Sequence, residues 1–200
     1  LILDGPIRPM LQEYGLKEAD FLDAYINGRL TEKLYGNTSL LALTQPALIK
    51  RIHGQYLEAD ADIIKTNSLN ANFILKYSSD MDKLIHTINR QSALIARQIA
   101  DKYSTQNKPR FVAGVLGPAT ESLNGFCTSK YTDKQDFNYD TLVEIYAQQA
   151  GALLEGGVDM FLIETIIDSQ SVKAALSAIE KVNARQLPVT IAVTPTDKKG

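Results

Sequence analysis

Glu58-Ala-Asp-Ala-Asp-Ile-Ile-Lys-Thr66 and Glu155-Gly-Gly-Val-Asp-Met-Phe-Leu-Ile-Glu-Thr165 follow one pattern in two separate parts of the chain. Each segment reads as a helix end, a tight turn, an Asp, a buried strand, and then polar residues where the strand stops. Parallel sheets, whether open or closed into a barrel, carry their chemistry at that end of the strands. The functional residues are therefore expected at strand ends.

Length and composition favour one ordinary globular domain. The 200 residues are 44% hydrophobic, which is enough for one sizeable core and a single domain over residues 1–200. The formal net charge is −2, and Lys and Arg are spread along the chain, which argues against nucleic acid or an anionic membrane as partner. The single cysteine, Cys127, cannot form an internal disulfide, and no signal peptide or membrane-spanning run is apparent. We expect a cytoplasmic protein with a small partner.

Apolar residues recur at helical spacing in four stretches, and short runs rich in branched residues lie between them. The expected helices contain residues 48–56, 84–99, 142–153 and 172–179, and the expected strands are residues 1–4, 63–64, 111–116, 160–163 and 189–193. Apolar strands that alternate with helices are typical of a parallel α/β protein, either a doubly wound sheet or a (β/α)8 barrel. As a barrel, the chain would hold five strands of eight, and we expect it to be truncated.

Polar residues follow each expected strand. They are Asp4-Gly5, Lys65-Thr66-Asn67-Ser68, Gly117-Pro118, Glu164-Thr165 with Asp168 close behind, and Thr194 to Asp197. A parallel barrel would bring Asp4 and Glu164 together, with Asp168 as a third carboxylate. Such a pair can hold an ammonium group while hydroxyl and backbone N–H donors hold a carboxylate, so the set suits a zwitterion. The alternative is that Asp4 and Asp168 are turn or N-cap residues and that Glu164 ends a strand in solvent.

Other motifs carry less information. Gly114 and Gly117 lack the third glycine of a dinucleotide-binding fingerprint. His53 and His86 lie in expected helices, where surface or packing roles are expected rather than catalysis. One cysteine and two histidines cannot supply a recognisable zinc site, so the residues alone assign no metal.

Taken in order, four segments resemble the homocysteine-binding domain of cobalamin-dependent methionine synthase. That family also includes the homocysteine and betaine-homocysteine methyltransferases. The segments are residues 2–5, 61–67, 111–118 and 154–165, followed by Ile167-Asp168 and residues 173–175. The resemblance covers essentially the whole chain. It implies a (β/α)8 TIM barrel, truncated here to about its first five strands, as the amino-terminal part of one homocysteine-binding domain.

The resemblance also implies a site. Family members hold zinc through three cysteine thiolates near the ends of the sixth and eighth strands, and zinc keeps the homocysteine sulfur as a nucleophilic thiolate. Asp4 and Glu164 match positions expected to contact the homocysteine amino group. The other expected substrate-binding residues are Gly5, Thr66, Asn67, Gly117 and Asp168. The zinc ligands are absent from this chain, and Cys127 matches none of them.

Three departures from the family pattern concern the expected site. The family's first loop usually reads Asp-Gly-Gly-Met-Gly-Thr, whereas Asp4-Gly-Pro-Ile-Arg-Pro9 has lost two glycines and two backbone donors. Lys65 stands where the family commonly has Glu, which reverses the charge. Asp60 replaces the usual Gly between helix and strand, and we expect it to occupy the left-handed conformation there.

The sequence therefore predicts part of a homocysteine S-methyltransferase of the methionine synthase type, with methylcobalamin as methyl donor and zinc as cofactor. Expected partners are homocysteine and the cobalamin- and folate-binding domains of the longer enzyme, with no nucleic acid and no membrane. The segment alone is expected to be inactive. Betaine and S-methylmethionine remain alternative methyl donors. A second hypothesis is a diverged, non-catalytic half-barrel that binds a small amino acid or a partner chain.

Overall fold

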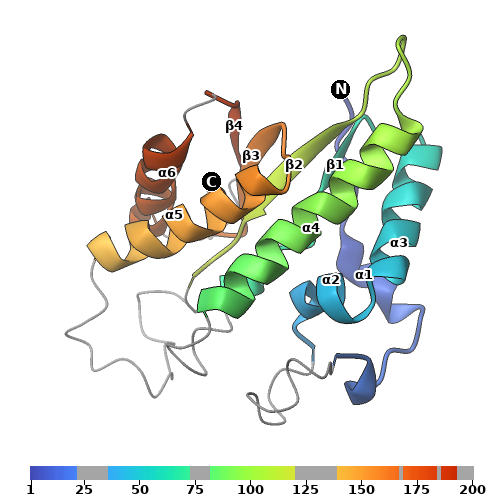
Figure 1. Cartoon of the computed structure of the whole chain (residues 1–200), viewed down its shortest axis with the longest axis horizontal. Helices are drawn as coiled ribbons and strands as arrows, with labels where there is room; N and C mark the ends of the chain where they lie inside the picture. The colour runs from blue at the N-terminus through green and yellow to red at the C-terminus, as the bar shows by residue number, and fades with distance from the viewer. Residues whose placement is uncertain (22–35, 73–81, 120–138, 167–168, 184–185, 193–200) are drawn as a thin grey trace, which may run out of the picture.

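The structure is a computed structural model that describes residues 1–21, 36–72, 82–119, 139–166, 169–183 and 186–192. Within these ranges, helices alternate with strands along the chain (Figure 1). The larger elements are α3 (Pro46–Glu58), β1 (Ile63–Lys65), α4 (Asp82–Tyr103), β2 (Phe111–Leu116), α5 (Tyr139–Glu155), β3 (Met160–Glu164), α6 (Ser169–Val182) and β4 (Val189–Ala192). Shorter pieces precede them: α1 (Ile7–Gln12), η1 (Glu18–Phe21), η3 (Thr38–Leu40) and α2 (Leu41–Thr44).

The strands form one parallel sheet in the order β1-β2-β3-β4. The predicted first strand lies beside β1 as a single parallel bridge between Leu3 and Ile63, flanked by hydrogen bonds from Ile63 N–H to the Ile2 carbonyl and from Asp4 N–H to the Ile63 carbonyl. Residues 1–4 therefore extend the sheet by one short segment. All carboxyl ends of the strands lie at the same edge, as the alternation of helices and strands predicts.

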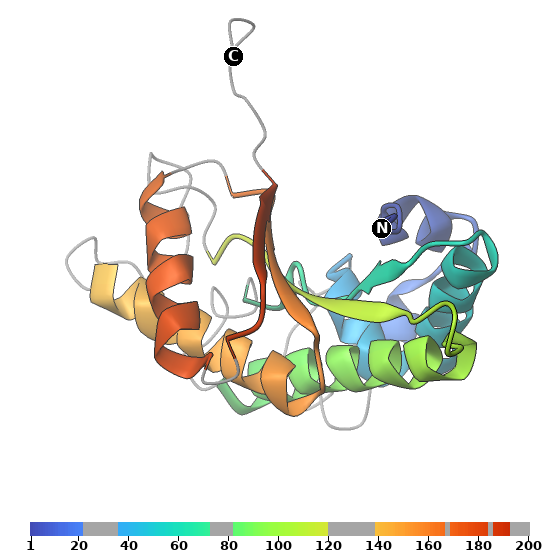
Figure 2. The same ribbon diagram turned by 90° about the horizontal axis from the view of Figure 1, so that it is seen from above.

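The two faces of the sheet carry different apolar clusters because successive strand residues point to opposite sides. Val112 and Leu116 of β2 pack with α4, α5 and α6 in the main core, together with Phe161 of β3. Ala113 and Val115, one position along, pack on the other face with Leu162. In Figure 2 the helices α3, α4, α5 and α6 follow one another along one side of the sheet. The second face is therefore the one that a closed barrel would enclose.

Three of the connections that lead from a helix to the next strand contain a residue with positive φ. Asp60 has φ 78° after α3, as expected from the sequence, Gly157 has φ 90° after α5, and Gln186 has φ 53° between α6 and β4. Gly156 is needed for a different reason, since an added Cβ would lie 2.3 Å from the Cβ of Ala93 and 2.7 Å from the Arg90 carbonyl oxygen. The close approach lets α4 and α5 pack against each other.

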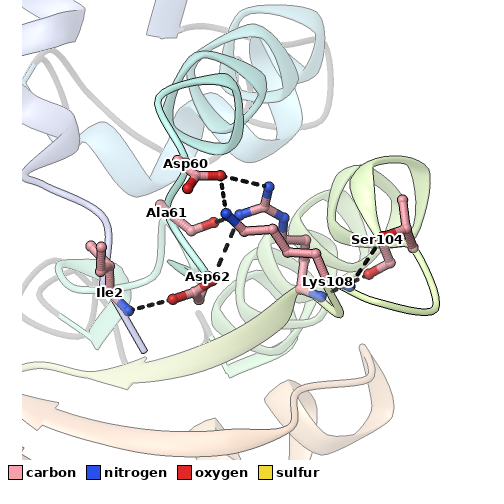
Figure 3. A network of polar contacts seen from close by, with 8 residues as sticks. Ile2, Asp60, Ala61, Asp62, Ser104 and Lys108 are labelled. Carbon is pink, nitrogen blue, oxygen red and sulfur yellow. Dashed lines mark hydrogen bonds and ion pairs between the residues drawn. The ribbon is translucent and has the colours of Figure 1, made fainter.

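Charged residues at the amino-terminal ends of the strands form a network (Figure 3). Asp62, just before β1, accepts a hydrogen bond of 2.7 Å from the Ile2 N–H and lies beside Arg110. Asp60 forms ion pairs with both Lys108 and Arg110. Arg110 also donates to the Ala61 carbonyl, so the start of β2 is tied to the turn that precedes β1.

The second copy of the sequence pattern repeats the Asp contact. Asp159, just before β3, accepts a hydrogen bond of 2.8 Å from the Val112 N–H of β2 and forms a 2.6 Å ion pair with Arg97. In both copies the Asp that precedes a strand therefore holds the backbone of the strand before it. These Asp residues lie at the edge opposite the predicted site, where residues in this type of fold contribute to stability rather than to catalysis.

Most of the predicted elements are present. The helix that begins at Pro46 has proline at its first turn, where a missing N–H costs nothing. His53 is buried in α3 at 1% exposure, which fits the predicted packing role, and His86 lies on α4 beside Glu155. None of the helices in the described ranges is long and apolar enough to cross a membrane.

Candidate functional site

Three charged residues from three separate strand ends come together at the carboxyl edge of the sheet. The backbone N–H of Lys65 donates a 3.0 Å hydrogen bond to Oδ2 of Asp4. The ammonium group of the same lysine lies 3.4 Å from Oε2 of Glu164, and both side chains are 19% exposed. Lys65 therefore joins the two carboxylates that the sequence predicts to lie together.

Asp4 is the most perturbed carboxyl group of this cluster. Burial raises its pKa to about 7, and the charge of Glu164 adds to that rise, while the Lys65 N–H and ammonium oppose it. Oδ1 is buried and has no hydrogen-bond partner among the described residues. A buried acceptor without a donor is costly, and in a native protein it calls for an explanation such as a bound ligand or water.

The loop after Asp4 packs against a tyrosine of α3. The Tyr56 hydroxyl donates a 2.9 Å hydrogen bond to the Pro6 carbonyl. An added Cβ on Gly5 would lie 2.9 Å from that hydroxyl oxygen, so a larger residue at this position would displace the end of the Tyr56 side chain. Burial raises the pKa of Tyr56, and the negative charge of Asp4 adds to the effect. Pro6 and Pro9 have no backbone N–H to donate, but the carbonyl of Pro6 still accepts the hydrogen bond from Tyr56.

Thr66, Asn67 and Ser68 are buried and make hydrogen bonds within the protein. Oγ1 of Thr66 accepts the Val115 N–H at 2.9 Å and lies 2.7 Å from Oγ of Ser68, which in turn donates to the Val115 carbonyl at 2.8 Å. The Asn67 amide donates to the Thr38 carbonyl at 2.7 Å. These side chains fix the loop after β1 onto β2, so direct contact with a substrate by Thr66 and Asn67 stays a prediction.

Gly117 follows β2 where the chain passes close to the same loop. A Cβ at this position would lie 2.1 Å from the Leu69 carbonyl oxygen, so only glycine fits. Gly117 and the loop after β1 therefore hold each other in place. Asp168, the remaining predicted site residue, lies outside the described residues, as does Cys127.

A network of buried side-chain amides is hydrogen-bonded to the loop after β1. The Gln149 amide donates to Oδ1 of Asn89 at 3.1 Å and to the Ser68 carbonyl at 3.3 Å, and its oxygen accepts from Asn72 at 2.7 Å. Gln149 falls in the helix expected over residues 142–153, which the sequence analysis did not connect with a function. Asn89 and Gln149 lie within two of the expected helical stretches, and this could have signalled the network, because polar groups in a core need partners.

Sequence reasoning also missed the partners of the acid pair. Lys65 was identified as a strand-end residue and a charge reversal but not as a partner of both carboxylates, and Tyr56 falls only within the helix expected over residues 48–56. No group of three His, Cys, Asp or Glu side chains in the described part of the chain could hold a metal ion. The cluster of Asp4, Lys65 and Glu164 is suited instead to an organic ion that carries a positive group toward Asp4.

Comparisons with known proteins agree with this architecture. The family model described as homocysteine S-methyltransferase matches residues 1–200. The homocysteine methyltransferase MmuM from Escherichia coli, in its oxidized form, has a TM-score of 0.71 and 20% sequence identity to this chain. Its metallated form has a TM-score of 0.69 and 20% identity, and its apo form has a TM-score of 0.66 and 18% identity.

These structures show the fold. Each alignment covers 98% of this chain, but only 63%, 64% and 60% of the three MmuM chains, respectively. The predicted fold is confirmed, since the described strands and helices match the first part of a (β/α)8 barrel. The chain spans less than two thirds of the proteins it resembles in structure.

Proposed function

The chain belongs to the homocysteine S-methyltransferase family, and from this we propose that residues 1–200 form the amino-acid-binding part of an enzyme that converts homocysteine to methionine. The reaction forms a bond between the homocysteine sulfur and a methyl carbon, while the bond from that carbon to its donor breaks. We propose methylcobalamin as the donor, as in methionine synthase, with the cobalamin- and folate-binding domains of a longer enzyme as partners.

The observation that carries the proposal is the unpartnered carboxylate oxygen of Asp4. An α-ammonium group brings three N–H donors and a positive charge, and one N–H can satisfy Oδ1 where the described residues offer no donor. Glu164 adds a second negative charge from the end of β3. Hydrogen bonds between an ammonium and a carboxylate are among the stronger ones in proteins, so the acid pair supports binding of an amino acid.

The surrounding loops would keep this acceptor in place. Tyr56 holds the loop after Asp4 through Pro6, and Thr66 holds the loop after β1 against β2. Both contacts fix backbone close to the carboxylate before any ligand arrives. Preorganisation of this kind reduces the entropy lost on binding.

Zinc in this family would keep the homocysteine sulfur deprotonated and nucleophilic at neutral pH. The residues of this chain do not fit that metal, because a structural or catalytic site with three thiolates needs more than the single cysteine present. The contribution of residues 1–200 is therefore to bind and orient the amino acid. We expect the 200-residue segment alone to form no methionine.

The proposal is tested by substituting Glu164 in the native polypeptide and measuring homocysteine binding by calorimetry. Glu164→Ala should weaken binding by roughly 1.5–3 kcal/mol, because the cluster loses the charge-assisted hydrogen bond between Glu164 and the Lys65 ammonium. Glu144→Ala is the matched control, because Glu144 pairs with Lys181 on the exposed faces of α5 and α6. Equal affinities for Glu164→Ala and the control would remove Glu164 from the site.

The methyl donor is tested separately. The native polypeptide is incubated with homocysteine and either methylcobalamin, betaine or S-methylmethionine, and methionine is quantified. Product from methylcobalamin alone is the expected result. Tight homocysteine binding without product from any donor would favour the diverged, non-catalytic binding protein.

A further inference from the structure

Lys65 holds both carboxylates of the cluster through two different groups. Its backbone N–H is bonded to Asp4, so the main chain at this position is fixed relative to that carboxylate. Its side-chain ammonium is not needed for the bond to Asp4, and it lies beside Glu164. An ion pair with both side chains only 19% exposed is less screened by solvent than a surface pair.

The single positive charge of Lys65 is not shared equally between the carboxylates of Asp4 and Glu164. Lys65 neutralises Glu164 at 3.4 Å, whereas Asp4 receives one backbone N–H and keeps a buried oxygen with no donor. The two acids are therefore not equivalent. Asp4 still has an acceptor oxygen without a positively charged partner among the described residues, whereas Glu164 is already paired with Lys65.

A zwitterionic amino acid would meet a cation as well as an anion here. If its ammonium group lies on Asp4, its carboxylate is carried on the adjacent carbon and needs a positive partner nearby. Lys65 supplies that charge from the residue whose backbone is bonded to Asp4. The first loop offers less, since Pro6 and Pro9 have no N–H to donate.

We propose that Lys65 is a specificity-determining residue that receives the α-carboxylate of the amino acid, while Asp4 receives its ammonium group and Glu164 positions Lys65. The order of charges is then Asp4, ligand ammonium, ligand carboxylate, Lys65 and Glu164, with opposite signs next to each other throughout. The inference rests on the proposed function and adds to it: Lys65 selects ligands that carry a carboxylate, and Glu164 acts through Lys65.

Three ligands distinguish recognition of the ammonium group by Asp4 from recognition of the carboxylate by Lys65. Homocysteine carries both charged groups, aminopropanethiol lacks the carboxylate, and mercaptobutyrate lacks the ammonium group. Their dissociation constants are measured by calorimetry on the native polypeptide, first without substitution and then with Lys65→Met. Methionine at position 65 keeps the backbone N–H to Asp4 and a similar side-chain length but removes the charge.

The expected result is a selective loss. Lys65→Met should weaken homocysteine binding roughly 10- to 150-fold, which is the loss of one charge-assisted hydrogen bond. Binding of aminopropanethiol, which has no carboxylate to lose, should not weaken. Lys65→Arg keeps the positive charge and should retain most of the preference for homocysteine. Lys181→Met, which removes an exposed lysine paired with Glu144, is the control and should change neither affinity.

Other outcomes decide against the inference or against the proposed function. If Lys65→Met binds homocysteine as well as or better than the unsubstituted protein does, Lys65 only blocks Glu164 and the inference is wrong. Equal weakening of homocysteine and aminopropanethiol would mean a general structural role for Lys65, which also overturns it. If the unsubstituted protein binds none of the three ligands, the proposed function itself fails.

Discussion

Asp4 and Lys65 are joined by a hydrogen bond of 3.0 Å between a carboxylate oxygen and a backbone N–H, across 61 positions of the chain. The bond uses one oxygen of Asp4 and leaves the other buried without a partner. Burial without full compensation disfavours the ionised form, and this raises the pKa of Asp4 to about 7. Near neutral pH, the proposed ligand acceptor is therefore partly protonated and must lose that proton to hold an ammonium group.

Asp4→Asn should stabilise the protein at pH 8 and remove part of its pH dependence. The pKa of Asp4 rises from 3.8 in the unfolded chain to about 7 in the folded protein. The stabilisation that comes from the raised pKa of Asp4 is therefore fully present below pH 3.8, and it is lost as the pH rises through 7 and the buried carboxyl group ionises. Asparagine can still accept the Lys65 N–H but carries no charge. The free energy of unfolding, measured in urea from pH 4 to pH 8, should fall less with rising pH in the variant. An unchanged slope would contradict the perturbed pKa.

His53→Leu should protect the protein against acid. Burial lowers the pKa of His53 from 6.5 to about 4, and its Nε2 has no hydrogen-bond partner among the described residues. Between pH 6.5 and pH 4, His53 therefore binds a proton in the unfolded chain but not in the folded protein. The free energy of unfolding decreases as the pH falls through this range. The loss is of the order of 3 kcal/mol. Urea midpoints at pH 5 and pH 7.5 should differ less in His53→Leu than in the unsubstituted protein. A variant that loses as much stability at pH 5 would show that His53 does not titrate in this range.

Alanine at two glycine positions should have opposite effects. Gly117→Ala places a Cβ 2.1 Å from the Leu69 carbonyl oxygen, so the backbone must shift, at a cost of roughly 1–3 kcal/mol or more. Gly151, inside α5, has no atom within 4 Å of an added Cβ. Gly151→Ala should therefore stabilise the protein by about 0.5–1 kcal/mol through helix propensity. Thermal and urea unfolding of both variants check the sign, and a neutral Gly117→Ala would mean that the loop after β1 moves easily.

Two aspartates that share one arginine should differ in importance. Asp159 accepts the Val112 N–H and pairs with Arg97, whereas Asp101 pairs with Arg97 from an exposed position on α4. Asp159→Ala should cost about 1.5–3 kcal/mol, since a backbone donor and a partly buried charge lose their acceptor. Asp101→Ala should cost at most about 1 kcal/mol, as expected for an exposed pair. Similar losses in urea unfolding would assign the effect to Arg97 packing alone.

The sequence predicted the elements of this fold well because local chemistry determines them. The periodicity of α4 and the run Phe111–Leu116 are sufficient to predict a helix and a buried strand. The left-handed turn at Asp60 followed from its place between helix and strand. Residues 1–4 were predicted as a full strand, but they form only one bridge, to a neighbouring strand, β1, that is itself three residues long.

The sequence predicts which polar residues lie at the strand ends, but not which groups they contact. Asp4 and Glu164 were expected to be close because parallel strands end at one edge. The Lys65–Glu164 pair could not be predicted, since the residues lie 99 positions apart and meet across β2 only through the register of three strands. Substrate contact by Thr66, which the family resemblance implies, stays a prediction. Its hydroxyl accepts the Val115 N–H, and composition gives no sign of that bond.

Asp62, which precedes β1, and Asp159, which precedes β3, each accept a hydrogen bond from a segment that comes earlier in the chain. Asp62 holds Ile2, and Asp159 holds Val112, so neither contact waits for a later part of the chain. During synthesis, when amino-terminal segments leave the ribosome first, each strand would already meet its partner as it emerges. At β1 and β3, assembly can then follow the direction of translation, because each of these strands emerges with a hydrogen-bond acceptor ready for a segment that already exists.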